Sequence, residues 1–522
     1  MHTRTFTKVV VALMVVAAGL ATAIQVSAQQ HTRYKLIDLG TFGGPSSVLA
    51  PTIDGGPENP GRALTHNGVV VGVAETNIPD PFAPNLCNSS DCLVSHAFRY
   101  EDGVLTDLGA LNGLSTNGSL AAWINDRGWI AGASSTGTLD PLSGNPGSRS
   151  VLWRNGEIVD LGTLGEDFGG AVALNNLGQV VGFSTNGIPD PFFGTQSRAF
   201  LWQNGVMHDL GTLCESPSVC GANAQAWAVN ESGHVAGISA TNQTPNPAMG
   251  IPTFHPFLWH NGKMIDLGTL GGTMTGVDGP AMLLNNRGQV AGTSTLAGDV
   301  NPATGNLIYH PFFYDKGVMT DMGTLGGDTG FVTWLNDAGA AVGTADLPGP
   351  SGGQSHHAFL WRNGVMTDLG SLGSSSHAEG INSAGQIVGR YQTAGLNNPH
   401  RHAFLWENGG PMVDLNPLIP GNSPLELEEG GNINDRGEIA GRGYPAGCDD
   451  IDACGHAFLL IPCDPASGQD CSSVTESPGN AALANKQTAA SAQQNSTPAQ
   501  RFAGWRTRLA QRYQLDVTAS KD

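Results

Sequence analysis

The sequence lacks a second long apolar run. Its single run spans about residues 9–24, follows the charged residues Arg4 and Lys8, and leads to a small-residue site ending at Ala28. A charged start, a short hydrophobic core and small residues are the parts of a signal peptide, whereas a membrane-spanning helix needs about 20 apolar residues. We therefore expect residues 1–28 to be a cleaved signal peptide of an exported protein, secreted or periplasmic. An uncleaved membrane anchor is the alternative.

Basic residues are also scarce. The chain has 24 Lys and Arg against 44 Asp and Glu, a formal net charge of −20. Because an acidic surface repels nucleic acid and anionic lipid, we expect no nucleic-acid partner. The charge fits cationic partners or bound Ca²⁺, but it is also ordinary for a soluble exported protein.

Common catalytic signatures are missing. We find no Gly-x-Ser-x-Gly, no His-Glu-x-x-His and no phosphate-binding glycine loop. Active sites can assemble from loops that are distant in sequence, so an enzyme is not excluded. The sequence nevertheless favours a non-enzymatic role, with no catalytic residue and no metal ligand assigned.

Eight cysteines form four close pairs, and the spacing suits disulfides in an exported protein better than a zinc site with clustered Cys-x-x-Cys ligands. The pairs are Cys87/Cys92, Cys214/Cys220, Cys448/Cys454 and Cys463/Cys471. No cofactor is expected. Ca²⁺ is the one cation considered, at Asp449, Asp450 and Asp452 between two of the cysteines, and a solvated acidic loop is the simpler interpretation of these residues.

One unit repeats along the chain. Asp-Leu-Gly or a close variant recurs at spacings of 46 to 69 residues, a period typical of propeller blades. The aspartates are Asp38, Asp107, Asp160, Asp209, Asp266, Asp321, Asp368 and Asp414.

The seventh unit shows the pattern within each copy. Its runs His357–Trp361 and Val365–Leu369 flank Asn363-Gly364, a strong signal for a type I′ hairpin turn. A second turn, from Asn382 to Gly385, has the chemistry of a type I turn, with Asn first and Gly fourth. Only the first unit departs there, with Thr65 before Gly68. Each unit therefore predicts four antiparallel strands.

The two ends complete one another. The chain begins with a lone strand at Tyr34–Gly40 and ends with a strand at His456–Leu460 that lacks a hairpin partner. A propeller closes by such an offset, which leaves no long open edge. We therefore predict an all-β propeller over residues 34–462, with eight four-stranded blades closed by the N-terminal strand. A seven-bladed ring with a stray unit is the alternative.

The strands resemble the extracellular repeat family named HAF for its His-Ala-Phe motif. That motif occurs at His96, His357, His402 and His456, with His-Pro-Phe at His255 and His310 and arginine instead at Arg149 and Arg198. The resemblance implies an exported bacterial protein of uncharacterised activity and transfers no catalytic residue. From the expected distance between equivalent residues of neighbouring blades, we expect the ring of each histidine to hydrogen-bond the same turn in every blade rather than to share a metal ion, and we expect the repeated aspartates to be structural.

All long connections are expected on one face of the disc, opposite the tight turns. Function on such scaffolds tends to lie in variable loops, and the loop candidates for ligand binding are Asp80, Phe82, Asp190 and Phe192. The leading hypothesis is a module that binds an extracellular protein or polysaccharide. An enzyme acting on an extracellular polymer, hydrolase or lyase-like, is the runner-up, and a structural surface protein is the third.

Beyond the repeats, residues 463–498 have the composition of a low-complexity linker. Residues 499–522 form a basic segment in which Phe502, Trp505 and Leu509 recur at helical spacing. Such a segment can dock on the acidic body, on a partner or on a lipid surface. A disordered tail is the alternative.

Overall fold

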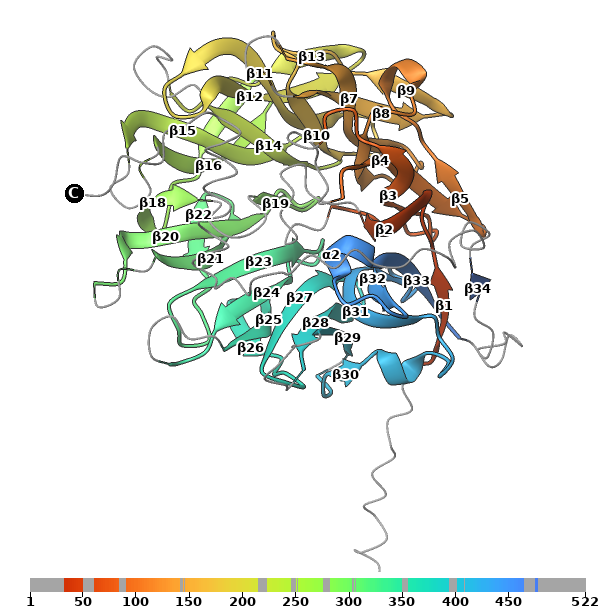
Figure 1. Cartoon of the computed structure of the whole chain (residues 1–522). Coiled ribbons are helices and arrows are strands. Elements are labelled where there is room, and N and C mark those ends of the chain that lie inside the picture. Colours follow the sequence, from red (N-terminus) through yellow and green to blue (C-terminus); the bar gives the residue numbers. More distant parts are fainter. Residues whose placement is uncertain are drawn as a thin grey trace, which may run out of the picture.

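Each four-strand unit of the sequence folds into one antiparallel sheet, and eight such sheets form a ring in the computed structural model (Figure 1). The structure describes residues 32–49, 61–83, 91–140, 144, 146–214, 223–245, 250, 252–275, 282–302, 305, 307–349, 355–393, 401–407, 409–463 and 475–476. The predicted signal peptide and the basic tail lie outside these residues. The fold is a β-propeller, as the repeat predicts.

Blades 1 to 4 follow the chain without interruption, each with its first strand innermost. Blade 1 contains β2 (Gly43–Leu49), β3 (Val70–Pro79), β4 (Leu93–Glu101) and β5 (Val104–Asp107). Blade 2 contains β6 (Ser119–Ile124), β7 (Ile130–Leu139), β8 (Pro146–Arg154) and β9 (Glu157–Asp160). Blade 3 contains β10 (Gly169–Leu174), β11 (Val180–Asp190), β12 (Gly194–Gln203) and β13 (Val206–Asp209). Blade 4 contains β14 (Ala224–Val229), β15 (Val235–Pro245), β16 (Pro252–His260) and β17 (Lys263–Asp266).

Blades 5 to 7 repeat this order, and the first strand of blade 5 is divided in two. Blade 5 contains β18 (Gly271–Thr275), β19 (Met282–Leu284), β20 (Val290–Val300), β21 (Leu307–Asp315) and β22 (Val318–Asp321). Blade 6 contains β23 (Gly330–Leu335), β24 (Ala341–Asp346), β25 (His356–Arg362) and β26 (Val365–Asp368). Blade 7 contains β27 (Ser375–Ile381), β28 (Ile387–Gln392), β29 (Arg401–Trp406) and β30 (Val413–Asp414).

Blade 8 joins the two ends of the propeller. Its strands are β31 (Leu425–Ile433), β32 (Ile439–Pro445), β33 (His456–Pro462), the N-terminal β1 (Tyr34–Asp38) and the short β34 (Thr475–Glu476). β1 pairs antiparallel with β33, in a register that places Tyr34 opposite Pro462. The expected closure and the count of eight blades are therefore confirmed. β34 pairs parallel with β1, inside the segment for which the sequence predicted only a linker.

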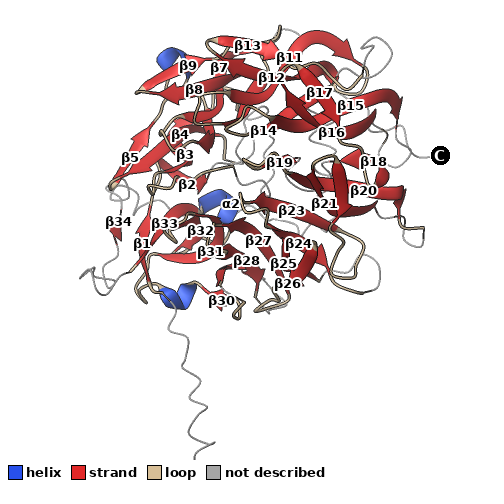
Figure 2. Cartoon of the chain, turned by 180° about the vertical axis from the view of Figure 1, so that it is seen from behind, coloured by secondary structure: helices blue, strands red, loops and turns tan. Residues whose placement is uncertain are grey.

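In the part of the chain that the structure describes, helical structure is confined to single turns. These are η1 (Leu111–Gly113), η2 (Asn416–Leu418) and α2 (Ile451–Cys454), which lies near the centre of the ring in both views (Figures 1 and 2). Within the described ranges, no helix has the length and apolar character needed to cross a membrane.

A glycine in the second strand determines how each blade packs. In blade 7, a Cβ on Gly389 would lie 1.9 Å from the carbonyl oxygen of His377 and 2.9 Å from the ring of Phe404. The first strand bulges at this level, between Ala378 and Gly380, and the Phe404 ring is fully buried. The repeated glycine therefore allows the first strand and the phenylalanine of the third strand to meet. Fully buried phenylalanines occupy this place in seven blades: Phe98, Phe200, Phe257, Phe312, Phe359, Phe404 and Phe458.

The asparagines of the second turn join neighbouring blades. In blade 7, the Asn382 side-chain oxygen accepts a hydrogen bond from the Gln386 N–H (2.9 Å), which closes its own turn. Its amide donates to the Asn434 carbonyl of blade 8 at 3.0 Å, and the Asn434 amide donates to the Thr65 carbonyl of blade 1 at 3.0 Å. We call this set the asparagine belt: Asn125, Asn175, Asn230, Asn285, Asn336, Asn382 and Asn434. The belt links blades 2 to 8 and then blade 1 on the tight-turn face.

Candidate functional site

The repeated histidines clamp the third strand of each blade to the fourth. In blade 6, His357 Nδ1 lies 2.9 Å from the Asp368 carboxylate, which also accepts a hydrogen bond from the Gly370 N–H at 2.7 Å. Arg149 and Arg198 make the equivalent contacts in blades 2 and 3. We call these contacts the His/Arg–Asp clamps: His96–Asp107, Arg149–Asp160, Arg198–Asp209, His255–Asp266, His310–Asp321, His357–Asp368, His402–Asp414 and His456–Asp38.

The clamps shift the pKa values of several of their members. Burial alone would raise the pKa of Asp107, but the hydrogen bonds from His96 and from the Gly109 N–H outweigh it and hold that pKa below its usual value. The hydrogen bond to Asp414 raises the pKa of His402. Since each clamp stays within its blade and recurs in all eight, its role is structural, with the carboxylate favoured in its charged form.

The four predicted ligand-binding residues divide into turn-forming carboxylates and partly exposed rings. The Asp80 carboxylate accepts a hydrogen bond from the Phe82 N–H at 2.8 Å, and the Asp190 carboxylate accepts one from the Phe192 N–H at 2.9 Å. Asp190 also accepts from the Asn223 side-chain amide at 2.8 Å. Because the two pairs belong to blades 1 and 3, with blade 2 between them, the structure does not bring them together into one site.

Among the predicted cysteine pairs, Cys448 and Cys454 form a disulfide with a Cα–Cα distance of 5.7 Å. Cys92, Cys214 and Cys463 are disulfide-bonded as well. Their predicted partners Cys87, Cys220 and Cys471 lie outside the described residues.

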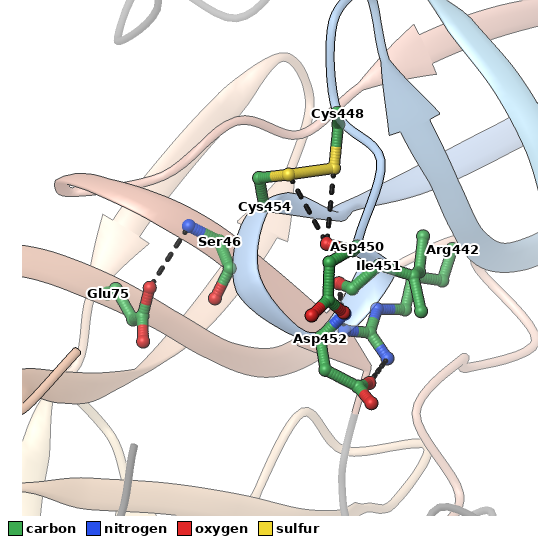
Figure 3. Close-up of a disulfide and its surroundings, with 8 residues drawn as sticks. All are labelled: Ser46, Glu75, Arg442, Cys448, Asp450, Ile451, Asp452 and Cys454. Carbon is green, nitrogen blue, oxygen red and sulfur yellow. Dashed lines mark hydrogen bonds and ion pairs between the residues drawn. A yellow bond between two sulfur atoms is a disulfide. The ribbon is translucent and has the colours of Figure 1, made fainter. Parts of the chain in front are cut away.

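The Cys448–Cys454 loop carries α2 and connects to the second strand of blade 8 (Figure 3). The Asp450 carboxylate accepts from the Asp452 N–H at 3.0 Å and so caps the helix. Arg442 of β32 contacts the Asp452 carboxylate at 2.9 Å and donates to the Ile451 carbonyl. Two of the three aspartates considered for Ca²⁺, Asp450 and Asp452, are therefore engaged by the protein itself, while Asp449 is exposed.

A group of charged side chains lies between blades 7 and 8. Arg390 of β28 has a side chain only 5% exposed, and its guanidinium lies 3.0 Å from the Glu379 carboxylate of β27. The same nitrogen lies 2.8 Å from the Glu429 carboxylate of β31, the first strand of blade 8. One arginine thus joins two blades through ion pairs near the inner strands.

A second pair extends this group toward the loops. Arg401, at the start of β29, lies 3.3 Å from the Glu428 carboxylate, and the Glu428 side chain is 2% exposed whereas that of Arg401 is 42% exposed. Burial raises the pKa of Glu428, and the neighbouring Glu429 raises it further, against the opposing effect of the arginines. Burial therefore opposes the charged form of Glu428, and the neighbouring arginines favour it.

Two histidines border these ion pairs on the side of blade 6. His356 Nε2 lies 2.6 Å from His377 Nε2, and the Thr344 hydroxyl lies 3.1 Å from His377 Nδ1. Burial and the charge of Arg390 lower the pKa of His356 to about 4 and lower the pKa of His377 well below 6.5. Both rings are therefore neutral at neutral pH. We call the whole group the charged cluster: His356, His377, Glu379, Arg390, Arg401, Glu428, Glu429 and Arg442.

The charged cluster replaces neutral residues of the repeat. A glycine recurs in the second strand of every blade, and the residue that follows it is neutral in blades 1 to 6 but arginine in blades 7 and 8. The residues in blade order are Val73, Ala133, Phe183, Ile238, Thr293, Thr344, Arg390 and Arg442. Glu379 occupies the bulge position filled by Ala122, Val172, Trp227 and Thr333 in blades 2, 3, 4 and 6. The cluster was not predicted from the sequence, because its members are not among the residues that the copies share. Aligning the copies and looking for departures would have found it.

The cluster offers hydrogen-bonding groups of both charges. Besides Arg401, its border includes the Asp452 side chain, which is 81% exposed, and Glu426, whose carboxylate lies 2.9 Å from His402 Nε2. Guanidinium, carboxylate and imidazole groups bind hydroxyl, carboxyl and amide groups of a ligand. Among the described residues, no group of three or more His, Cys, Asp or Glu side chains is arranged to hold a metal ion.

No protein family and no curated protein matches the chain, so the resemblance to the HAF repeats stays a prediction. Among solved structures, the propeller domain of the trilobed protease from Pyrococcus furiosus is 9% identical, with 72% of this chain and 99% of that chain covered and a TM-score of 0.40. The acylaminoacyl peptidase of Pyrococcus horikoshii is 12% identical, with coverage of 76% and 58% and a TM-score of 0.38. An ulvan lyase of polysaccharide lyase family PL25 is 10% identical, with coverage of 72% and 86% and a TM-score of 0.34.

Proposed function

We propose that the protein is an exported binding propeller whose loop face, over blades 6 to 8, holds an extracellular polysaccharide or protein. The observation that carries the proposal is the charged cluster, which stands where the other copies of the repeat have neutral residues. A site for one ligand requires such asymmetry, because a feature present in every blade serves the scaffold.

The energetics of buried charge support this interpretation. Removing one partner of a buried ion pair costs about 3–5 kcal/mol, yet replacing the whole group with packed apolar residues is often neutral or stabilising. Blades 1 to 6 pack without these charges, so a blade does not need them to fold. The cluster therefore fits a role in recognition better than a role in stability.

The ligand would reach the cluster through its exposed members. Arg401 is the best anchor, since its side chain is 42% exposed while its partner Glu428 is buried. Buried Glu428 holds the guanidinium in place, and such preorganised donors lose little freedom when a ligand binds. Asp452 on the disulfide loop would border the same surface.

Binding of the mature protein to immobilised polysaccharides and extracellular proteins tests the proposal, with Arg401→Ala as the variant. Arg436→Ala is the matched control, because Arg436 is 46% exposed, pairs with Glu438 and lies in a tight turn on the opposite face. We expect saturable binding to one ligand class, at least about tenfold weaker for Arg401→Ala, a loss of roughly 1.4 kcal/mol, and unchanged for Arg436→Ala. Equal affinity of the two variants would contradict the placement of the site.

An enzyme acting on an extracellular polymer is the second candidate function. The observation that favours it is the neutral His356–His377 pair, which Arg390 and Arg401 influence together with Glu428, because groups with opposed pKa shifts are what general acid–base catalysis requires. Incubation with a polysaccharide and peptide panel would then release products, and His377→Asn would abolish the release while leaving ligand retention intact. Retention without product release supports the binding role, and the absence of both would indicate a structural surface protein.

A further inference from the structure

A cavity opens on the tight-turn face at the junction of blades 6 and 7. It has a volume of about 220 Å³, and its walls include Leu360 and Arg362 of blade 6 and Ile381 and Trp406 of blade 7. For comparison, an apolar cavity of about 150 Å³ is enough to hold benzene. The cavity therefore has room for one six-membered ring with a small substituent.

The cavity exists because blade 6 has a short side chain at a position where other blades have a long one. Ala340 precedes β24 and stands opposite Arg362, the last residue of β25, one step beyond the paired residues Ala341 and Trp361. In blades 2, 3, 4, 5 and 7, the side chains at these two positions contact each other, a contact that the methyl group of Ala340 cannot make. The contacting pairs are Trp129–Arg154 (5.9 Å from the guanidinium carbon to the ring centroid), Gln179–Gln203 (3.0 Å), His234–His260 (stacked rings, 4.0 Å between centroids), Gln289–Asp315 (3.2 Å) and Gln386–Glu407.

A turn glycine of blade 7 shows the same lack of a neighbouring side chain. At the junction of blades 2 and 3, a Cβ on Gly178 would lie 2.7 Å from the ring of Trp129, which covers that turn. At the junction of blades 6 and 7, the equivalent glycine is Gly385, which lines the cavity together with Ala340. A Cβ on Gly385 would meet nothing within 4 Å. The space therefore extends from Ala340 to the turn of the next blade.

Arg362 brings a positive charge to this cavity. Its side chain is exposed, and among the described residues its guanidinium has no hydrogen-bond or ion-pair partner. In blade 2, by contrast, the equivalent Arg154 lies 5.9 Å from the ring centroids of both Trp129 and Trp202. The exposed residue Ser383 also lines the cavity and adds a hydroxyl group. Because a guanidinium binds a carboxylate through two parallel hydrogen bonds, the charge of this cavity matches a ligand that carries a carboxylate.

We propose that the cavity binds a small organic anion made of one ring that carries a carboxylate, either an aromatic acid or an acidic sugar residue. Arg362 pairs with the carboxylate, while Leu360, Ile381 and Trp406 contact the ring. Small-molecule sites have this composition, with mostly apolar walls and a few polar groups that orient the ligand. The cavity lies on the face opposite the long loops, so the proposal does not depend on the polymer binding proposed above.

Two substitutions test the site, and each introduces the residue that blade 3 has at the same position. Ala340→Gln fills the cavity, because the equivalent residue of blade 3 is Gln179. Arg362→Gln removes the charge, because the equivalent residue there is Gln203. Both variants should fold, since the same pair packs in blade 3, and the second keeps the test decisive if the first does not. Arg154→Gln is the matched control, because it removes the equivalent arginine of blade 2.

Binding to the full mature chain is measured by NMR titration of the ligand signals. The probes are benzoate and glucuronate, with benzyl alcohol and glucose as their neutral counterparts. We expect saturable binding of at least one carboxylate at millimolar concentration, and affinity at least about tenfold lower for its neutral counterpart. Ala340→Gln and Arg362→Gln should each weaken carboxylate binding at least about tenfold, whereas Arg154→Gln should leave it unchanged. Binding of benzoate alone would identify an aromatic acid as the ligand class, and binding of glucuronate alone an acidic sugar residue.

The proposal would be overturned if neither carboxylate saturates the wild type, or if the wild type and both site variants bind with equal affinity. Equal affinity for the neutral counterparts would also overturn it, because the guanidinium would then contribute nothing. Arg401→Ala separates this cavity from the proposed polymer site, since it should weaken polymer binding and leave carboxylate binding unchanged. A carboxylate affinity that falls in Arg401→Ala would instead place the anion on the loop face.

Discussion

Two sets of polar contacts stabilise this propeller, and they differ in how often they occur. The asparagine belt and the His/Arg–Asp clamps occur in nearly every blade, with the same atoms and similar distances. The charged cluster occurs once, across blades 6 to 8, and uses full charges in positions where other blades have neutral side chains. The repeated contacts build the ring, and the single cluster distinguishes one part of it from the rest.

The two sets also differ in the free energy needed to bury their polar groups. Each clamp or belt contact is a single hydrogen bond or ion pair at the margin of a blade, with a net contribution of about 0.5–1.5 kcal/mol. The cluster buries Arg390, Glu379 and Glu428, so its ions must compensate their own desolvation through one another.

Deleting residues 34–40 removes β1 and should have the largest effect. The deletion exposes one edge of β33 and removes the buried side chains of Tyr34, Leu36 and Leu39. At about 1.5–3 kcal/mol for each buried side chain, the loss is comparable to the whole stability of a typical domain. Thermal unfolding and limited proteolysis should show an unfolded blade 8. A deletion of residues 499–522 serves as the control, and unchanged stability without β1 would favour an open array over a closed ring.

Arg390→Thr should cost about 3–5 kcal/mol, because it removes the guanidinium that pairs with buried Glu379 and with partly buried Glu429. Threonine occupies the equivalent place in blade 6 as Thr344, so the backbone accepts it. Urea unfolding measures the loss. A cost below about 1 kcal/mol, the value of an exposed ion pair, would mean that the cluster is solvated.

The fold was largely predictable from the sequence, since turn chemistry is local. The Asn-Gly hairpins, the Asn-to-Gly turns and the spacing of the apolar runs specify each blade, and the unmatched ends specify the closure at Tyr34 and Pro462. Of the contacts in the asparagine belt, only those within each turn could be predicted from the sequence. That Asn382 closes its own turn follows from its place, but its amide bond to Asn434 depends on how neighbouring blades pack.

The charged cluster was not predicted, because its members are far apart in the sequence and carry no motif. Arg390 and Glu429 meet only since blade 8 packs against blade 7. The loop candidates Asp80 and Asp190 were chosen from recurring Asp-Pro dipeptides, and the structure shows both carboxylates holding local turns. Residues that recur in the blades stabilise the scaffold, whereas residues that differ from the repeat mark the candidate site.

His377→Phe should change the pH dependence of stability. The pKa of His377 in the folded protein lies well below its unfolded value near 6.5, so the unfolded chain binds more protons as the pH falls below that value. The wild type should therefore lose up to about 2.5 kcal/mol of stability between pH 7 and pH 4.5 through this residue. The variant, which carries the residue of blade 6 at this position (Phe331), should lose less. Urea unfolding midpoints of the wild type and the variant are measured at the two pH values. An equal loss of stability in both proteins would show that His377 does not titrate as inferred.

His357→Ala should have the smallest effect, a loss of about 1 kcal/mol, because one clamp of eight is removed and the Asp368 carboxylate remains partly exposed and still bonded to the Gly370 N–H. Thermal unfolding should shift slightly, with ligand binding unaltered. A severalfold loss of binding would place the clamps in the functional site.

The most direct test of the account is a variant that restores neutral residues to the cluster: Arg390→Thr, Glu379→Thr and Glu429→Gln together. The two threonines occur at these positions in blade 6 as Thr344 and Thr333, and glutamine keeps the shape of Glu429 while removing its charge. Stability and binding to the polymer panel are measured on the same preparation. We expect this variant to recover at least half of the stability lost in Arg390→Thr alone, while its binding falls at least about tenfold, or about 1.4 kcal/mol. Wild-type binding by this variant, or stability no better than that of the single mutant, would contradict the claim that the cluster serves recognition and not folding.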